Sequence, residues 1–346
     1  MSGESLPVAP ELNFLNERIL VTGATGFVGN HLVRKLHEQG FQVRCLVRPT
    51  SIVSRLVDLG IEVTVGDIFD IKAISNAVEN TDVIFHLVGG GGVSTVSSRG
   101  LAELRELNVL SLKNVLEIVK DKLVKKVVHF SSISAMGVQK GVKLTENSYC
   151  KPITPHEVAK RESEELALEY SRNLGIPVTI LRPSQIYGPG DTKSEILKIA
   201  RLVKKHLFPL VDGGAYYMPW VYVDDVVDCA IRAMLFGKPG EIYNVSDKMS
   251  YTLKDIVEEI AKNIPTANGG IYIPKEAASL LARAVEIFSE VLGIEPFFTT
   301  YRIESITSNR FVSIDKATKE LAYEPKINLD TGIRRTVEWY KHEGFL

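Results

Sequence analysis

The heptapeptide TPHEVAK, which begins at Thr154, places an imidazole and an amine one helical turn apart. Thr154 and Glu157 have the spacing of a capping box, and Pro155 takes the first helical position, so a helix is predicted to begin here. His156 and Lys160 then lie on one face of that helix. The lysine charge and the positive helix N-terminus both lower the pKa of a nearby imidazole, so His156 is expected to be uncharged at neutral pH. A neutral imidazole still donates an N–H hydrogen bond and polarises a carbonyl group.

Hydroxyl groups form a second candidate set in HFSSIS, residues 129–134. This segment ends a predicted strand, and ligands bind at the carboxyl edge of parallel sheets. A serine at that edge can hydrogen-bond a substrate carbonyl or carbinol. Serines also commonly begin loops, so the segment by itself is weak evidence.

Three glycines, Gly23, Gly26 and Gly29, lie between the short apolar run RILVTG and a segment with helical spacing. Glycine permits a tight turn, a close backbone approach to a pyrophosphate and close helix–strand packing. The helix N-terminus adds amide hydrogens and a positive dipole end. Many α/β proteins have glycine-rich turns, but the position after the first predicted strand favours a dinucleotide site.

The second predicted strand ends at Arg48, where NAD-binding folds of this kind place an acidic residue for the ribose. A guanidinium group instead pairs with a ribose 2′-phosphate and stacks on adenine. Thr50 and Ser51 can add hydroxyl donors. The sequence therefore favours NADP(H), with NAD still possible and a solvated arginine as the alternative interpretation. Asp67, after the third strand, is in reach of an adenine amino group or is an ordinary turn aspartate.

Apolar runs typical of buried strands alternate with segments of helical periodicity. The predicted strands span 18–23, 42–48, 61–67, 82–88, 126–132, 178–183 and 241–246, and the main predicted helices span 27–39, 98–121 and 155–173. This alternation predicts an α/β fold with a doubly wound parallel sheet, the Rossmann arrangement.

Past residue 184 the alternation gives way to loops rich in Pro, Gly and aromatic residues. We expect a loose N-terminal tail at 1–16, a dinucleotide-binding core at 17–183 plus about 216–246, and an interleaved substrate lobe at 184–215 plus 247–346.

The segment 277–293 of that lobe is amphipathic. Its polar face carries Ser279, Arg283, Glu286 and Glu290. Packing on a core is expected for such a helix. A lid over an apolar substrate and a membrane-surface helix are the alternatives, and the acidic polar face argues against anionic membranes.

The composition excludes several classes of protein. The 346 residues are 45% hydrophobic and 24% charged, with a formal net charge of -1, which gives no electrostatic argument for nucleic-acid binding. No stretch reaches 18 apolar residues, so no membrane span is predicted, and the N-terminus does not resemble a signal peptide. The three cysteines are scattered without metal-ligand or disulfide spacing, so we expect no metal site and reduced thiols in a cytoplasmic protein.

Taken together, the motifs resemble one family, the extended short-chain dehydrogenases/reductases, which includes nucleotide-sugar epimerases, dihydroflavonol reductases and 3β-hydroxysteroid dehydrogenases. The motifs, in the order of that family, are TGATGFVG, GDI, HLVGG, LNVLSLKNVLE, FSSISAMG, HEVAK, LRPSQIYGPGD and VYVDDV. They cover nearly the whole chain, which is more specific than any one of them.

The resemblance implies roles for individual residues. Ser132 matches the active-site serine, with Ser134 as the fallback, and Asn108 matches the structural and catalytic asparagine. Lys160 matches the lysine that binds the nicotinamide ribose, and His156 stands where the family has a tyrosine. The implied cofactor contacts are Gly23, Thr25, Gly26, Phe27, Val28, Gly29, Arg48, Asp67, Ile68, Leu87, Val88, Gly89, Lys160, Pro183 and Ser184. A homodimer built on the helices at 98–121 and 155–173 is also implied.

The resemblance leaves the activity open. Four glycines, Gly89 to Gly92, replace the small apolar residues usual after the fourth strand, which allows either close substrate approach or a mobile loop. The segments VRCLVRPTS and SIDKATKELAYEPKINLDTGIRRTVEWY look most like the dihydroflavonol-reductase and 3β-hydroxysteroid-dehydrogenase branch. We therefore expect an NADP(H)-dependent oxidoreductase for a secondary alcohol or ketone of an apolar small molecule, slowed by His156. A nucleotide-sugar epimerase or dehydratase and a non-catalytic NADP(H)-binding protein are the alternatives.

Overall fold

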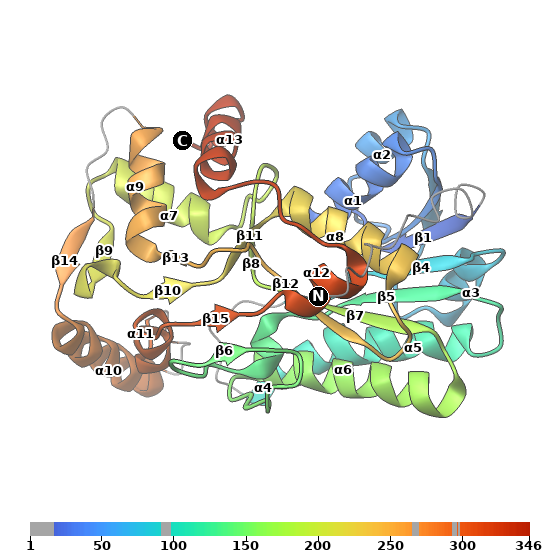
Figure 1. Cartoon of the computed structure of the whole chain (residues 1–346), viewed down its shortest axis with the longest axis horizontal. Coiled ribbons are helices and arrows are strands. Elements are labelled where there is room, and N and C mark those ends of the chain that lie inside the picture. Colours follow the sequence, from blue (N-terminus) through green and yellow to red (C-terminus); the bar gives the residue numbers. More distant parts are fainter. Residues whose placement is uncertain (1–16, 91–97, 265–269, 293–295, 297) are drawn as a thin grey trace, which may run out of the picture.

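A computed structural model describes residues 17–90, 98–264, 270–292, 296 and 298–346 (Figure 1). The predicted tail at 1–16 and two of the four glycines, Gly91 and Gly92, lie outside the described residues. The prediction of a doubly wound α/β fold is confirmed, because a seven-stranded parallel sheet forms the centre of the molecule.

The strand order in the sheet is β12-β7-β5-β4-β1-β2-β3, and all neighbours pair in parallel. The strands are β1 (Arg18–Thr22), β2 (Gln42–Val47), β3 (Glu62–Val65), β4 (Val83–His86), β5 (Lys126–Phe130), β7 (Val178–Pro183) and β12 (Ile242–Val245). The order reverses between β1 and β4, so a crevice for a ligand is expected at their carboxyl ends.

Helices cover both faces of this sheet, which is why its central strands are mostly apolar. On one face α1 (Phe27–Glu38) packs on α8 (Val223–Phe236), with Leu32 and Val226 fully buried between helix and sheet. The other face carries α3 (Ile71–Val78), α4 (Ser98–Arg105), α5 (Ser111–Val119) and α6 (Pro155–Leu174). The short α2 (Ser54–Asp58) leads into β3.

The single helix predicted at 98–121 is interrupted. A π-helical turn, η2 (Glu106–Leu110), separates α4 from α5. Asn108 lies in this turn and its amide nitrogen donates to the carbonyl of Leu104 at 2.8 Å. Such π-turns inside helices are frequent at functional sites.

A smaller lobe is built from short strand pairs and helices. The pairs are β8 (Gln185–Tyr187) with β11 (Trp220–Tyr222), β9 (Pro209–Val211) with β14 (Ile271–Ile273), β10 (Tyr217–Met218) with β13 (Tyr251–Thr252), and β6 (Lys143–Leu144) with β15 (Phe311–Val312). The helices are α7 (Glu195–Lys204), α9 (Leu253–Lys262), α10 (Lys275–Leu292), α11 (Thr300–Ile306), α12 (Asp315–Leu321) and α13 (Leu329–His342), with 3-10 turns η3 (Ile133–Met136) and η4 (Asp212–Gly214) elsewhere. Buried side chains of α7, α9 and α13 form an apolar cluster of their own.

The amphipathic segment at 277–293 forms most of α10, but it packs differently from the expectation. The helix contacts the lobe through small residues, Ala278, Ala282 and Ser289, which are at most 3% exposed. Its large apolar side chains face outward, and Leu280 is 72% exposed. The small inner residues let α10 approach α11 closely, and in the described part of the chain no element covers the opposite face.

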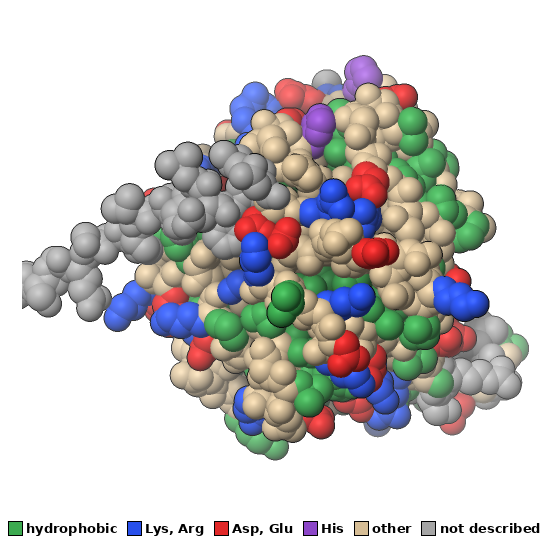
Figure 2. Space-filling model, turned by 90° about the vertical axis from the view of Figure 1, so that its right-hand side faces the viewer, with side chains coloured by type: hydrophobic (Ala, Val, Ile, Leu, Met, Phe, Trp, Pro, Cys, Tyr) green, Lys and Arg blue, Asp and Glu red, His purple; other side chains and the backbone are tan. Residues whose placement is uncertain are grey.

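Charge is evenly distributed on the side of the molecule that carries α2 and α3. Figure 2 shows basic and acidic side chains interspersed there, without an extended patch of one sign. In the described part of the chain, no helix combines the length and the apolar character needed to cross a bilayer.

Candidate active site

The glycine turn lies at the carboxyl end of β1, against β4. Gly23 has φ of +77°, and a Cβ there would lie 2.9 Å from the carbonyl carbon of Leu87. A Cβ on Gly29 would lie 2.2 Å from the Gly23 carbonyl oxygen. Both positions therefore require glycine, as the sequence predicts. Gly26 is the N-cap of α1 and forms no side-chain cap, so the first amides of α1 remain available to a phosphate.

The predicted adenosine contacts lie beside this turn on the neighbouring strands. Arg48 directly follows β2, whose Leu46 pairs with Thr22 of β1, and its side chain is exposed. No hydrogen bond or ion pair engages that guanidinium within the described ranges. Asp67 follows β3, and one of its carboxylate oxygens accepts from the Phe69 amide at 3.0 Å, so it is at least a turn aspartate. Ile68, after it, is buried.

At the other end of the crevice, Asn108 and Lys160 converge on Gly89. A Cβ at Gly89 would lie 2.7 Å from Asn108 Oδ1 and 2.9 Å from Lys160 Nζ, and its φ is +152°. Asn108 donates to the Gly90 carbonyl at 3.1 Å and accepts from the Gly90 amide at 3.3 Å. The asparagine thereby fixes the start of the glycine run, next to Leu87 and Val88.

The capping box predicted at the start of α6 is present, with Pro155 in its first turn. Lys160 is buried, and its Nζ donates to the Phe130 carbonyl at 3.1 Å, at the end of β5. Burial lowers the pKa of Lys160 to about 8, against the opposing attraction of Glu164. The amine is therefore still mostly protonated at pH 7.

His156 lies one turn earlier on α6. Burial, with a smaller effect of the Lys160 charge, lowers the pKa of His156 to about 4. The predicted direction is confirmed, although burial rather than the lysine is the larger cause. The imidazole is consequently neutral near pH 7, and its buried Nδ1 has no hydrogen-bond partner among the described residues.

Hydroxyl groups at the ends of β5 and β7 complete the site. Ser132 is the N-cap of η3, a turn that packs on α6, and its Oγ accepts from the Ser134 amide at 3.2 Å, so its hydroxyl proton stays available. Two further hydroxyls, on Ser134 and Ser184, are buried without a partner in the described part of the chain. Pro183 ends β7 directly before Ser184. Buried polar atoms without partners usually indicate a missing ligand or water.

A buried ion pair that the sequence did not single out anchors α6. Glu164 accepts from Arg182 Nε and Nη2, both at 2.7 Å, and both side chains are almost fully buried. Ser131 donates to the same carboxylate at 2.6 Å. This bidentate pair joins α6 to β7 and to the end of β5, and so holds His156 and Lys160 against the sheet.

The small lobe reaches the site through Tyr301 of α11, which was also not predicted. Its hydroxyl donates to Glu157, whose other carboxylate oxygen accepts the amides of Ile153 at 2.8 Å and Thr154 at 3.0 Å. The capping box of α6 is thus also the contact between the core and α11.

Two buried histidines lie beneath the site. His86 and His129 stack with ring centroids 5.7 Å apart, on adjacent strands β4 and β5. His86 contacts Thr22 Oγ1 at 3.0 Å and Ser111 Oγ at 3.3 Å, and His129 contacts Ser163 Oγ at 3.2 Å. Burial, assisted by Lys160, lowers the pKa of His86 to about 3, so the ring is neutral. Periodicity assigns both residues to strands but gives no sign of this pairing.

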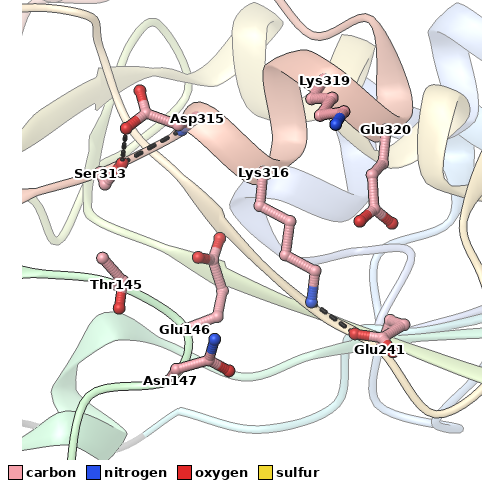
Figure 3. Close-up of a pocket in the computed structure, with 9 residues that line it drawn as sticks. All are labelled: Thr145, Glu146, Asn147, Glu241, Ser313, Asp315, Lys316, Lys319 and Glu320. Carbon is pink, nitrogen blue, oxygen red and sulfur yellow. Dashed lines mark hydrogen bonds and ion pairs between the residues drawn. The ribbon is translucent and has the colours of Figure 1, made fainter.

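An open polar hollow of about 590 Å³ lies away from these residues, between α12, the end of β6 and the start of β12 (Figure 3). Four carboxylates and two lysines line it, and Lys316 pairs with Glu241 across one side. None of the predicted site residues belongs to it. We place the active site at the glycine turn and α6 because the required glycines, the buried Lys160 and the unpartnered polar atoms of His156, Ser134 and Ser184 lie there.

The comparisons with known proteins show the family to which the chain belongs. Residues 19–246, well over half of the chain, match the NAD dependent epimerase/dehydratase family. The chain belongs to this family. Its members are NAD(P)-dependent epimerases, dehydratases and reductases, so a nicotinamide dinucleotide is the cofactor of the family.

Individual relatives are distant and act on different substrates. A 4-hydroxy-2-methyl-3-oxo-4-farnesyl-3,4-dihydroquinoline-1-oxide ketoreductase of Stigmatella aurantiaca is 25% identical, covering 91% of this chain and 94% of that protein. The 3beta-hydroxysteroid-dehydrogenase/decarboxylase isoform 1 of Arabidopsis thaliana is 27% identical, covering 93% of this chain and 79% of that protein.

Solved structures share the fold over almost the full length. The crystal structure of gox2253 is 27% identical with a TM-score of 0.82, covering 96% of this chain and 100% of that one. The UDP-glucuronic acid 4-epimerase of Bacillus cereus in complex with NAD is 22% identical with a TM-score of 0.76, covering 94% of this chain and 99% of the other. At that identity the epimerase supports the fold alone.

Proposed function

We propose that the protein is an NADP(H)-dependent oxidoreductase that reduces a ketone, or oxidises a secondary alcohol, of an apolar small molecule. The observation that carries the proposal is His156, a partly buried neutral imidazole one turn from a buried lysine, whose buried Nδ1 has no partner in the described part of the chain. In this proposal His156 stands at the position of the family tyrosine, and the lobe at 184–215 plus 247–346 holds the substrate.

A bound nicotinamide would supply hydride transfer, and the protein side chains would position and polarise the substrate oxygen. The His156 N–H donates a hydrogen bond to that oxygen, and the Ser132 hydroxyl donates a second one. A neutral imidazole is a poor acid, so the Lys160 ammonium, with its pKa of about 8, is the better source of positive charge as the alkoxide develops. Asn108 fixes the start of the glycine run through its hydrogen bonds to the Gly90 backbone.

The preference for NADP(H) rests on Arg48. Its exposed guanidinium, at the end of β2 beside the glycine turn, has no competing carboxylate partner in the described structure and can pair with a 2′-phosphate. We expect NADPH to bind at least tenfold more tightly than NADH, and Arg48→Ala to abolish the preference. Titration of both cofactors at fixed salt measures this. Equal affinities in the wild type would contradict the assignment.

Two relatives support an apolar substrate. The names of the Stigmatella and Arabidopsis proteins refer to a farnesylated dihydroquinoline and to 3beta-hydroxysteroids. Both proteins are similar to this chain over at least nine-tenths of its length. Other relatives have the names of nucleotide-sugar enzymes. One, an uncharacterised UDP-glucose epimerase of Bacillus subtilis, is 27% identical to this chain. An epimerase or dehydratase is therefore the second candidate.

Substitution of His156 tests the proposal. An imidazole nitrogen falls roughly 1–2 Å short of a phenolic oxygen by bond geometry, and a misplacement of that size costs on the order of a hundredfold in rate. His156→Tyr should raise turnover of a simple ketone, whereas His156→Phe should abolish it. A His156→Phe variant as fast as the wild type would show that His156 has no role in turnover.

The alternatives give different outcomes. Thermal stabilisation by UDP or dTDP of the protein already saturated with NADPH favours an epimerase or dehydratase, because a reductase of apolar ketones has no nucleoside diphosphate site besides that of its cofactor. Inactivity of both wild type and His156→Tyr on a broad panel of ketones and alcohols, with NADPH still bound, favours a non-catalytic cofactor-binding protein.

A further inference from the structure

The outer face of α10 is an apolar surface that no described segment of the chain covers. Five large side chains are more than half exposed: Leu280 72%, Leu281 57%, Ile287 58%, Phe288 64% and Leu292 53%. Their spacings of one, four, seven and eight residues place them on one stripe of the helix. Ala277 and Ala284 are exposed on the same stripe, and no charged residue interrupts it. We name this set the α10 stripe.

The α10 stripe is unusual in size and purity for a soluble protein. Single exposed leucines are normal, but a contiguous apolar patch of several hundred Å² marks an interaction surface. Figure 1 shows α10 at the end of the molecule opposite to α1, α2 and α3.

We propose that the α10 stripe docks the protein on the surface of an electrically neutral lipid bilayer. A helix with one wholly apolar side lies in the plane of a membrane interface with that side among the acyl chains. The rest of α10 carries two basic and three acidic side chains, so it offers no net attraction to anionic headgroups. Zwitterionic lipid therefore fits it better than an anionic surface.

A second copy of the chain fits the α10 stripe less well. Stable protein interfaces bury roughly 800 Å² on each partner and contain about one hydrogen bond per 100–200 Å². The α10 stripe consists of side chains from one helix only, and none of them can form a hydrogen bond. A bilayer needs neither flanking contacts nor hydrogen bonds.

The position of α10 also connects the surface to the active site. Glu286 of α10 accepts from the amide of Thr300 at 2.8 Å and from its hydroxyl at 3.0 Å, at the start of α11. One residue further on α11, Tyr301 bonds Glu157 in the capping box of α6. Docking at α10 thus places α11, which contacts the start of α6, next to the lipid. This position suits the uptake of an apolar substrate, a consequence that rests on the proposed function.

Flotation of the full chain with vesicles of pure phosphatidylcholine tests the docking directly. The wild type should float with the vesicles, and Leu280→Ser/Phe288→Ser should bind at least tenfold more weakly with unchanged thermal stability, because both side chains already face solvent. The matched control is Ile52→Ser/Leu123→Ser, which removes side chains 87% and 97% exposed elsewhere and should float like the wild type.

Several outcomes would overturn the inference. Absence of the wild type from the vesicle fraction would do so, as would equal binding by the two double variants. Binding only to phosphatidylglycerol vesicles would show charge attraction instead. A wild-type dimer that Leu280→Ser/Phe288→Ser dissociates, without vesicle binding, would assign the α10 stripe to a second copy.

Activity separates this inference from the proposed function. The Leu280→Ser/Phe288→Ser variant should reduce a short water-soluble ketone at the wild-type rate and lose at least tenfold in rate on an apolar ketone presented in phosphatidylcholine vesicles. Normal vesicle binding by a protein that reduces no ketone would sustain the docking and contradict the proposed function.

Discussion

Helices α6 and α10 reverse the usual relation between polarity and burial. On α6 the charged Lys160 and Glu164 are at most 6% exposed, whereas on α10 the apolar Leu280 and Phe288 are more than half exposed. Both helices are amphipathic in sequence, so their composition does not explain the difference. The difference in burial depends instead on the contacts that other elements offer to each side of the helix.

Each buried charge of α6 meets a partner built by another element. Arg182 of β7 pairs with Glu164, and the Phe130 carbonyl of β5 accepts from Lys160. On α10 the inner side holds only small residues, such as Ala282, against α11 and β9. A helix buries the charged side chains for which its neighbours provide partners and the apolar side chains for which they leave room. Side chains that find neither stay exposed.

Breaking the charged contact of α6 should have the largest effect. Glu164→Gln leaves Arg182 buried without a counter-charge, so we expect the free energy of unfolding to fall by about 3–5 kcal/mol. Glu165→Gln is the matched control: Glu165 is 57% exposed and pairs with Arg161, so its loss should change stability by less than about 0.5 kcal/mol. Urea titration of both variants measures the difference, and equal losses would contradict the role of the buried pair.

Two neighbouring residues test the same point on α10. Ala282 is fully buried, so Ala282→Leu should overpack the contact with α11 and cost about 1–3 kcal/mol. Leu281 is 57% exposed, and Leu281→Ala should cost less than about 0.5 kcal/mol. Thermal unfolding of the two variants checks the orientation of the helix. A larger loss for Leu281→Ala would mean that α10 is rotated or covered.

Adjacent glycines sharpen the role of the α6 lysine. A methyl group at Gly89 would meet both Asn108 and Lys160, whereas one at Gly90, whose φ is also positive at +132°, meets no atom within 4 Å. Both alanine variants carry backbone strain, so their difference isolates the contact. We expect NADPH to bind Gly89→Ala at least tenfold more weakly than Gly90→Ala. Fluorescence titration measures the two affinities for NADPH. Similar values would mean that Lys160 does not belong to the cofactor site.

The smallest expected effect concerns pH. The pKa of His156 is about 4 in the folded protein, below the value of roughly 6.5 of an unfolded histidine. Between these values the unfolded chain binds more protons, so stability rises with pH across this window and is lost as pH falls. His156→Gln should make this pH dependence shallower than in the wild type. Unfolding at a series of pH values measures both slopes, and an unchanged slope in His156→Gln would contradict the burial of the imidazole.

Local sequence was sufficient for several parts of the fold and site. The capping box at Thr154, the glycine turn at Gly23 and the alternation of strands with helices each depend on residues close together in the chain. Their geometry follows from backbone hydrogen bonding and steric freedom within a few residues. The depressed pKa of His156 was also predictable in direction, because Lys160 lies four residues away on the same helix.

Tertiary structure decided what depends on distant residues. The Glu164–Arg182 pair, the Tyr301–Glu157 contact and the stacked His86 and His129 join segments that no periodicity relates. The hydrophobic pattern of α10 determined that the helix is amphipathic, but not which side would meet the protein. Sequence fixes the faces of a helix through its 3.6-residue period, whereas burial of a face depends on the shape and chemistry of whatever packs against it.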